Sequence, residues 1–407
     1  MTSLTVGANG LAWWTAQRRT FGNIEGKIVM EKRNQASGTE SKQLLDRVAS
    51  ARSRLCDKLI HLNIESLDIS EYNQRYLESK IAGINDMLQL YGRLLYLSLN
   101  NSPVSPENFV LVDYGGGSGL ISFLALEMGV GTVIYNDIYD VSCADVRRLS
   151  KVLGLTLDHV VCGDVDELIL YLGENSIFIN SITSYDVLEH IYDVESHFKK
   201  LASLSGSQFR IVYGSGANIA NLLYVHSVRK RQIEVEYKDR EKRPGQKGRD
   251  SLQAYLGARK KMISSYAPNL SSEQVEQLAC STRGLIQRDI EKCVDEYRRQ
   301  GRITYHPGHP TNTCDPYTGN WCEHLLDFGW LEQILENEGF SVKILAGRYN
   351  TSKSLLKKSV KLVFNAAIQI LGRWGMFAAP YYIVYAEFFA EKAAGSNRCS
   401  AAHETSR

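Results

Sequence analysis

The chain has 407 residues, of which 44% are hydrophobic and 23% are charged, and its 47 Lys and Arg are nearly balanced by 45 Asp and Glu. This is the composition of a globular protein, and it excludes a collagen-like or a wholly disordered chain. The formal net charge of +2 excludes a uniformly charged binder of nucleic acid or membrane, so any anionic partner must be sought in local charge.

The cysteine pattern and the apolar runs indicate the compartment. The eight cysteines form no Cys-x-x-Cys pair and are too sparse for a disulfide scaffold, which favours a reducing environment. Residues 1–27 lack the apolar core of a secretory signal. No uncharged apolar stretch reaches the roughly 20 residues that are needed to cross a bilayer. We therefore expect a cytoplasmic protein, soluble or peripherally bound to a membrane.

The N-terminal part of the chain predicts two zones. Residues 1–44 are polar and contain scattered glycines, which is typical of a flexible leader. Residues 45–105 carry apolar side chains at helical spacing, for example Ile84, Leu88 and Leu95. We expect this second zone to form a helical cap that packs on the rest of the protein.

The remaining chain predicts one α/β unit with a large insertion. Residues 106–218 alternate short apolar strands with helices, which is typical of a parallel sheet covered on both faces. Residues 219–325 form a helical insertion, the α/β pattern resumes over 326–390, and 391–407 form a flexible tail. The predicted fold is α/β, a doubly wound, mostly parallel seven-stranded sheet with a helical N-terminal cap and a helical insertion before the last two strands. The candidate strands are 109–114, 132–136, 159–162, 177–184, 209–213, 340–346 and 381–388.

A glycine-rich turn, Asp113-Tyr-Gly115-Gly-Gly117-Ser-Gly119, joins the first candidate strand to a helix. Without Cβ atoms, such a turn lets a ligand approach backbone N–H groups that face it. A dinucleotide site requires Gly-x-Gly-x-x-Gly, but Leu120 stands three positions after Gly117, and a P-loop would require a Lys that is absent. The turn therefore favours a nucleotide-type ligand of another class, the alternative being a turn without a ligand.

The turn and the motifs that follow it resemble those of the class I S-adenosylmethionine-dependent methyltransferases. Asp137 ends the next strand, Cys162-Gly-Asp164-Val165 matches their third motif, and Glu189-His190 matches the end of their fourth. The segment Gly339-Phe-Ser-Val resembles the start of their penultimate strand. The resemblance covers about residues 109–218 and 326–389, in family order.

The resemblance implies that S-adenosylmethionine is the cofactor. It implies that the Asp137 carboxylate accepts both ribose hydroxyls and that Asp164 lies near the adenine amino group. Taken singly, each of these residues could instead be an Asp that caps a turn. The residues implied in cofactor binding are Asp113, Gly115, Gly117, Gly119, Asp137, Ile138, Asp164, Val165 and Tyr185.

Methyl transfer requires a positioned acceptor and, for some acceptors, a group that removes its proton. Histidine titrates near neutral pH, and one histidine follows the fourth motif while three stand in the loop that ends the insertion. This loop suits a substrate site held by Pro and Gly turns, although an irregular loop with satisfied polar groups remains open. The candidate catalytic residues are His190, His306, His309 and His324.

No metal is assigned from the sequence. In some relatives the segment with Asp186, Glu189 and His190 contributes to a divalent-cation site, which stays an alternative here. Zinc in the loop 306–324 is a second alternative, but the spacing His-x2-His-x4-Cys-x7-Cys-x-His matches no standard structural zinc framework.

Two basic stretches could meet anionic partners. Residues 229–261 contain twelve Lys or Arg against five Asp or Glu, yet they lack the interleaved aromatic residues of a stacking surface, so nucleic acid is not expected. From Gly339 to Ala386 there are seven Lys or Arg and no acidic residue, and residues 353–377 within this stretch are strongly apolar. That segment could lie in a membrane surface, but we favour a crossover helix packed on the sheet.

These patterns predict an enzyme. We expect transfer of a methyl group from S-adenosylmethionine to an oxygen or nitrogen of a small-molecule or lipid- or saccharide-linked acceptor. One alternative is an NAD(P)-dependent oxidoreductase, suggested by Tyr349-x-x-x-Lys353 but opposed by the glycine spacing. The other is a methyltransferase-like binding module without turnover.

Overall fold

The computed structural model describes residues 40–204, 208–241, 251–350 and 355–388. The predicted leader lies almost entirely outside these ranges. The predicted tail, Lys353 and residues 242–250 of the basic stretch 229–261 also lie outside them. Among the described helices, none combines the length and apolar character that crossing a membrane requires.

The centre of the molecule is a seven-stranded sheet in the order β3-β2-β1-β4-β5-β7-β6. The five strands from β3 to β5 in this order run parallel to one another, and β7 pairs antiparallel with both β5 and β6. The predicted fold class is therefore confirmed. The strands are β1 (Val110–Tyr114), β2 (Thr132–Asp137), β3 (His159–Cys162), β4 (Ser181–Tyr185), β5 (Phe209–Ser215), β6 (Phe340–Ala346) and β7 (Tyr382–Phe388).

Helices cover both faces of the sheet because alternate strand residues form two separate apolar cores. Leu111 and Val133 face a core with the N-terminal helices, whereas Val112 and Ile134 face the other core. On the first side lie a helix over residues 40–60, α2 (Glu71–Ile81), α3 (Ile84–Leu99), α4 (Leu120–Glu127) and α5 (Asp140–Leu153). On the second side lie α6 (Val165–Glu174), α7 (Val194–Ala202) and α12 (Phe328–Asn337).

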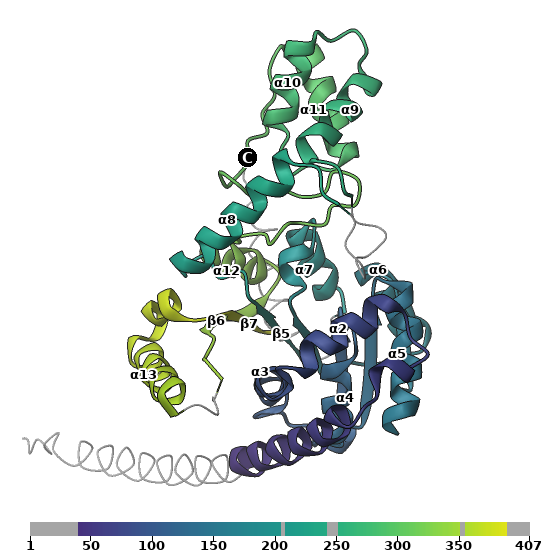
Figure 1. Cartoon of the computed structure of the whole chain (residues 1–407), viewed down its shortest axis with the longest axis vertical. Helices are drawn as coiled ribbons and strands as arrows, with labels where there is room; N and C mark the ends of the chain where they lie inside the picture. The colour runs from purple at the N-terminus through teal and green to yellow at the C-terminus, as the bar shows by residue number, and fades with distance from the viewer. Residues whose placement is uncertain (1–39, 205–207, 242–250, 351–354, 389–407) are drawn as a thin grey trace, which may run out of the picture.

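The insertion stands away from the sheet as a helical projection (Figure 1). It has an apolar core of its own, which includes Ile263, Leu278 and Val294. A fully buried ion pair between Arg259 and Glu236 links two of its helices. Arg259, one cation of the predicted basic stretch, is thus used inside the protein. The helices are α8 (Leu222–Tyr237), α9 (Tyr255–Tyr266), α10 (Ser272–Ser281) and α11 (Gln287–Gln300).

The remaining elements connect these layers. The short helical turns are η1 (Ile64–Ser66), η2 (Pro106–Asn108), η3 (Leu188–His190) and η4 (Gly372–Ala378), and α13 (Leu355–Leu371) precedes η4. One predicted boundary is wrong: the fourth strand begins at Ser181 rather than Ile177. Phe178 is exposed, and the Asn180 side chain accepts a hydrogen bond from the N–H of Val110. The residues before Ser181 therefore do not continue the strand.

The structure also contradicts the expectation of a crossover helix packed on the sheet. Ile368 of α13 is buried, but Leu362, Val363 and Ile370 are exposed, and Figure 1 shows α13 standing at the side of the molecule beyond β6. Periodicity indicates that a helix has an apolar face but not whether that face meets the sheet. The side chains of residues 355–357 lie outside the described part of the chain.

Candidate functional site

The candidate site lies between β1 and β4, where the order in which successive strands are added to the sheet reverses. From β1 the chain proceeds outward to β2 and β3, and it then returns to place β4 on the other side of β1. The crevice beyond the carboxyl ends of two such strands is where open α/β sheets bind ligands. Here the glycine turn follows β1 and Asp186 follows β4, so this crevice contains the main predicted motifs.

The glycine turn has a backbone that requires glycine. Gly115, Gly117 and Gly119 have φ values of 68°, 53° and 78°, in the left-handed region that L side chains rarely adopt. A Cβ on Gly115 would lie 2.4 Å from Val187 Cγ2, and one on Gly119 would lie 2.5 Å from Val146 Cγ2. A Cβ on Gly117 would meet no atom within 4 Å. Gly117 is therefore the point at which the turn is open to a ligand.

Asp113 shapes this turn from within the core. Its side chain is fully buried, and its Oδ2 accepts hydrogen bonds from the N–H (2.9 Å) and the hydroxyl (2.7 Å) of Ser122 in α4. Burial raises the pKa of Asp113 to about 7, although the Ser122 hydrogen bonds oppose this shift. Its Oδ1 has no protein partner within the described ranges. The sequence analysis expected Asp113 among the cofactor-binding residues. In the structure Asp113 is buried and stabilises the turn through its hydrogen bonds to Ser122.

Asp137 and Ile138 lie at the open side of the turn. The Asp137 carboxylate accepts hydrogen bonds from the N–H groups of Gly117 and Tyr139, each at 2.8 Å. A carboxylate has about four acceptor positions, so Asp137 can accept two further donors. Ile138 is apolar, yet 52% of its surface is exposed. The structure thus brings together three predicted cofactor residues.

Asp164 and Val165 begin α6 at the end of β3. Asp164 Oδ1 accepts the N–H of Asp166, and Glu167 accepts the N–H of Asp164, which completes a capping box. The Val165 side chain is buried in the core beneath α6. Asp164 therefore makes the contacts of a helix-capping residue, as the alternative interpretation expected. The proximity of Asp164 to the adenine amino group stays a prediction.

Aromatic side chains stand around the end of β4. The ring of Tyr185 packs edge-on against Tyr91 of α3 at 5.8 Å and against Tyr381 at 6.2 Å. Tyr76 of α2 reaches the same region from the cap: burial and then the negative charge of Asp186 raise the pKa of Tyr76. The helical cap thus contributes a wall to the crevice.

Three carboxylates gather beside Tyr185. Each of Asp186, Glu189 and Glu323 places a carboxylate oxygen within 4.8 Å of the other two. Asp186 and Glu323 have φ values of 63° and 52°, a left-handed backbone that costs a non-glycine residue about 1–2 kcal/mol and is concentrated at functional sites. The Glu189 side chain is fully buried, and its Oε1 accepts the Ser215 hydroxyl at 2.7 Å while Oε2 has no protein partner within the described ranges. Burial and then the charge of Asp186 raise the pKa of Glu189 well above its usual value.

The insertion supplies the partners of this cluster. Glu323 comes from the loop that ends the insertion, and it accepts hydrogen bonds from the Tyr224 hydroxyl (3.3 Å) and from Arg231 (3.0 Å), both in α8. Burial and then the charge of Glu323 raise the pKa of the Tyr224 hydroxyl. The end of β4 and the insertion therefore meet over a strongly acidic, partly buried group of side chains.

These three carboxylates form the sole group of His, Cys, Asp and Glu side chains in the described part of the chain that is close enough to hold a metal ion. Oxygen ligands of this kind suit Mg²⁺ or Ca²⁺. His190 does not belong to this group, and its Nδ1 donates to the Trp321 carbonyl oxygen at 2.9 Å. Among the described residues of 306–324, the His and Cys side chains form no group of three that is close enough to share a metal ion.

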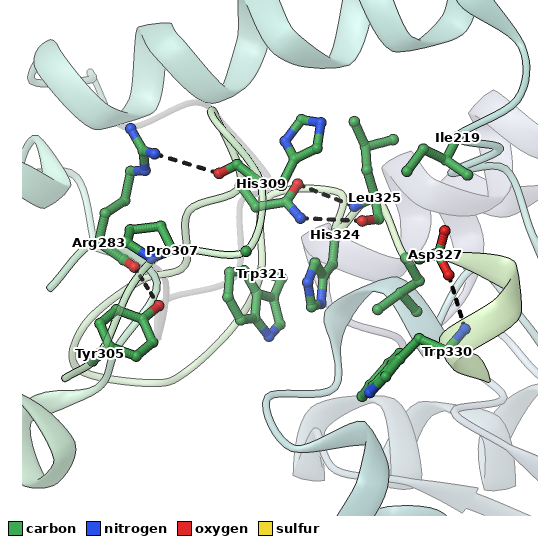
Figure 2. Close-up of a pocket in the computed structure, with 13 residues that line it drawn as sticks. Ile219, Arg283, Tyr305, Pro307, His309, Trp321, His324, Leu325, Asp327 and Trp330 are labelled. Carbon is green, nitrogen blue, oxygen red and sulfur yellow. Dashed lines mark hydrogen bonds between the residues drawn. The ribbon is translucent and has the colours of Figure 1, made fainter. Parts of the chain in front are cut away.

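A cavity of about 440 Å³ lies next to the carboxylate cluster. His324, which lines the cavity, directly follows Glu323 in the chain. Figure 2 shows His324 and Trp321 side by side in it, and their rings stack with centroids 3.9 Å apart. His324 Nδ1 has no partner within the described residues, and burial lowers the pKa of His324 to about 3. His324 is therefore neutral near pH 7 and is suited to stacking or hydrogen bonding.

The other candidate histidines are placed differently. His309 lines the same cavity, where burial and then Arg229 and Arg283 lower the pKa of its ring. His306 is exposed and does not line this cavity. His190 holds the loop at Trp321. The structure thus brings His309 and His324 to one cavity, with His190 hydrogen-bonded to Trp321 of its lining, and it leaves His306 outside that cavity.

The comparisons with known proteins concern the fold. No family model and no curated protein sequence matches the chain. One similar solved structure is an S-adenosylmethionine-dependent methyltransferase from Mesorhizobium loti, at 12% identity over 72% of this chain and 95% of the other, with a TM-score of 0.32. Another is the plantazolicin methyltransferase BpumL in complex with SAH, at 12% identity over 87% of this chain and 100% of the other, with a TM-score of 0.34.

The strand order and the antiparallel β7 assign the architecture independently of these low similarities. The chain has the doubly wound, mostly parallel seven-stranded α/β fold that the sequence predicted. Glu323, Tyr224 and Tyr76 were not predicted as site residues. None of them belongs to a motif that the sequence analysis recognised, and the packing of the cap and the insertion brings them to the end of β4.

Proposed function

We propose that the protein is an S-adenosylmethionine-dependent methyltransferase whose acceptor binds at the carboxylate cluster. The observation that carries this proposal is the geometry at the switch point: an open glycine turn at Gly117, the Asp137 carboxylate next to it, and the acidic end of β4 opposite.

The residues at the glycine turn fit S-adenosylmethionine. The free acceptor positions of Asp137 match two ribose hydroxyls, and the exposed side chain of Ile138 offers an apolar surface to a base. The missing Cβ of Gly117 allows a close approach to the backbone. When bound, this cofactor supplies an already activated methyl group, so the protein has to orient the acceptor and receive its proton.

Asp186 is the group best placed to receive that proton. Its side chain is exposed at the end of β4, unlike the buried Glu189, whose raised pKa favours the protonated form. Glu323 and Tyr224 complete the surroundings of the acceptor from the insertion. An oxygen or nitrogen acceptor that carries a proton suits this acidic surface, because its proton can pass to an Asp186 carboxylate oxygen.

The insertion over residues 219–325 would thus act as the acceptor-site wall, and the cap over 45–105 would close the crevice through Tyr76. The cavity lined by His309, Trp321 and His324 would hold an apolar or aromatic part of the acceptor, because two flat rings stack within it.

Isothermal titration calorimetry with S-adenosylmethionine, its demethylated product and NADPH tests the donor site. Asp137→Ala should weaken S-adenosylmethionine binding by about tenfold or more, since it removes a charged, bidentate acceptor. Asp158→Ala, an exposed aspartate before β3, is the matched control and should bind normally. Binding of NADPH in place of S-adenosylmethionine would refute the proposal and favour the oxidoreductase. Tyr349 already argues against that alternative, because its hydroxyl donates to the Ala378 carbonyl oxygen.

A screen with labelled methyl donor on metabolite extracts tests turnover. Once an acceptor is found, Glu323→Gln should lower the transfer rate while leaving donor affinity unchanged, because Glu323 belongs to the acceptor side. Glu336→Gln, on the exposed side of α12, is the control. Donor binding without transfer to any acceptor would instead favour the binding module.

A further inference from the structure

Only a narrow side of α13 faces the protein, and it combines the polar Asn365 with the buried Ile368. Asn365 holds it there, since its Oδ1 accepts the N–H of Tyr349 and its Nδ2 donates to the Tyr349 carbonyl oxygen, both at 2.8 Å. With 3.6 residues per turn, Lys358 and Lys361 lie on the same side of the helix as Asn365. A surface helix that stabilises a fold normally buries its whole apolar stripe against the core, whereas α13 leaves Leu362, Val363 and Ile370 exposed.

The apolar side of α13 is exposed within the described part of the chain. Ile370 is 83% exposed and Trp374, in the following turn η4, is 71% exposed. Leu222 and Leu223 are also exposed, and they lie near η4 because Asn221 donates to the Ala379 carbonyl oxygen. The whole surface, here termed the α13 apolar surface, comprises Leu222, Leu223, Val360, Leu362, Val363, Phe364, Ile370, Leu371, Trp374 and Phe377.

Cations accompany this surface. The sequence from Gly339 to Ala386 carries seven Lys or Arg and no Asp or Glu. Lys358 is exposed on α13, and Arg373 stands beside Trp374, where it pairs with Glu332. Exposed apolar and aromatic groups flanked by cations are the features of a helix that lies in the interface of an anionic bilayer.

We propose that the α13 apolar surface docks on an anionic lipid bilayer. Burial of its aliphatic and aromatic side chains among the acyl chains supplies most of the affinity, and the cations add attraction to the headgroups. The surface continues through Leu223 into Tyr224, which contacts the carboxylate cluster through Glu323. Docking therefore places the crevice at the end of β4 close to the bilayer, within reach of an amphiphilic molecule in the membrane.

Co-sedimentation of the full chain with vesicles tests the proposal directly. Binding should be clear with vesicles that contain phosphatidylserine, weak with phosphatidylcholine alone, and reduced by high salt. The double variant Ile370→Ser/Trp374→Ser should bind about tenfold or more weakly, because two large side chains no longer enter the bilayer. Lys358→Gln/Lys361→Gln should lower binding to the anionic vesicles only.

A matched control is the double variant Leu170→Ser/Phe178→Ser, which removes two exposed apolar side chains, one on α6 and one before β4. It should bind vesicles as the unchanged chain does. Circular dichroism and donor titration of each variant separate a loss of docking from a loss of fold or of the donor site.

Absence of vesicle binding by the unchanged chain would overturn the proposal, as would equal losses in the two apolar double variants. Sedimentation velocity tests whether a second copy of the chain, and not a bilayer, covers the α13 apolar surface. If the unchanged chain dimerises, ignores vesicles and becomes monomeric in Ile370→Ser/Trp374→Ser, then the surface is a contact between two copies and the membrane proposal is wrong.

Discussion

Replacing Asp113 with Asn should change how the stability of the protein depends on pH. Burial raises the pKa of the Asp113 carboxyl from 3.8 to about 7. The native state therefore favours the protonated carboxyl, and its contribution to stability is complete below the unfolded pKa and is lost as the pH rises toward the folded pKa. At about 1.36 kcal/mol per pKa unit, the loss between about pH 5 and pH 8 is about 3 kcal/mol. Asn does not ionise and should not show it.

Urea unfolding followed by circular dichroism at the two pH values measures this effect. The informative quantity is the difference between the unchanged chain and Asp113→Asn, because contributions from other groups cancel in it. His324 is one such group: its lowered pKa acts in the opposite sense, with stability lost as the pH falls below 6.5. Asp158→Asn, on the surface, is the control. If the unchanged chain and Asp113→Asn lose the same stability between the two pH values, the burial argument for Asp113 is refuted.

Two further substitutions test the packing of the site and of the insertion. Gly119→Ala should lower the free energy of unfolding more than Gly117→Ala, because both carry a left-handed penalty of about 1–2 kcal/mol but only the first also forces a Cβ against Val146; equal losses in urea titrations would contradict this. Arg259→Met should lower the free energy of unfolding by about 3–5 kcal/mol, because it leaves the Glu236 carboxylate buried without its cation. Adding Glu236→Leu should recover part of that loss, and a double variant less stable than the single one would count against the ion-pair explanation.

The parts of the site that could be predicted from sequence are those set by neighbouring residues. The glycine turn follows from its spacing and from the strand before it, and three of its glycines do adopt a left-handed backbone. Asp137 was expected at the donor site from the resemblance of its motif, and the structure places it beside the turn, where its carboxylate accepts the N–H of Gly117. Whether Asp113 faced a ligand or the core was not contained in the motif, since a strand-end carboxylate can point either way.

The parts that could not be predicted depend on contacts between distant segments. Glu323 and Tyr224 are unremarkable in sequence, and they become site residues because the insertion folds back onto the end of β4. The apolar side of α13 was visible in its periodicity, but the two hydrogen bonds between Asn365 and Tyr349 fix an orientation in which Leu362, Val363 and Ile370 are exposed.

The same contacts indicate how donor and acceptor recognition are divided. The donor side is built from strand ends and the turn after β1, which neighbouring parallel strands hold rigidly. The acceptor side combines Asp186 with Glu323 and Tyr224, which are held by the insertion and its buried Arg259. Substitutions in the insertion can therefore alter the acceptor while donor binding is preserved. Because α8 also carries Leu222 and Leu223 of the α13 apolar surface, the element that contacts the acceptor site would be the one that meets the membrane.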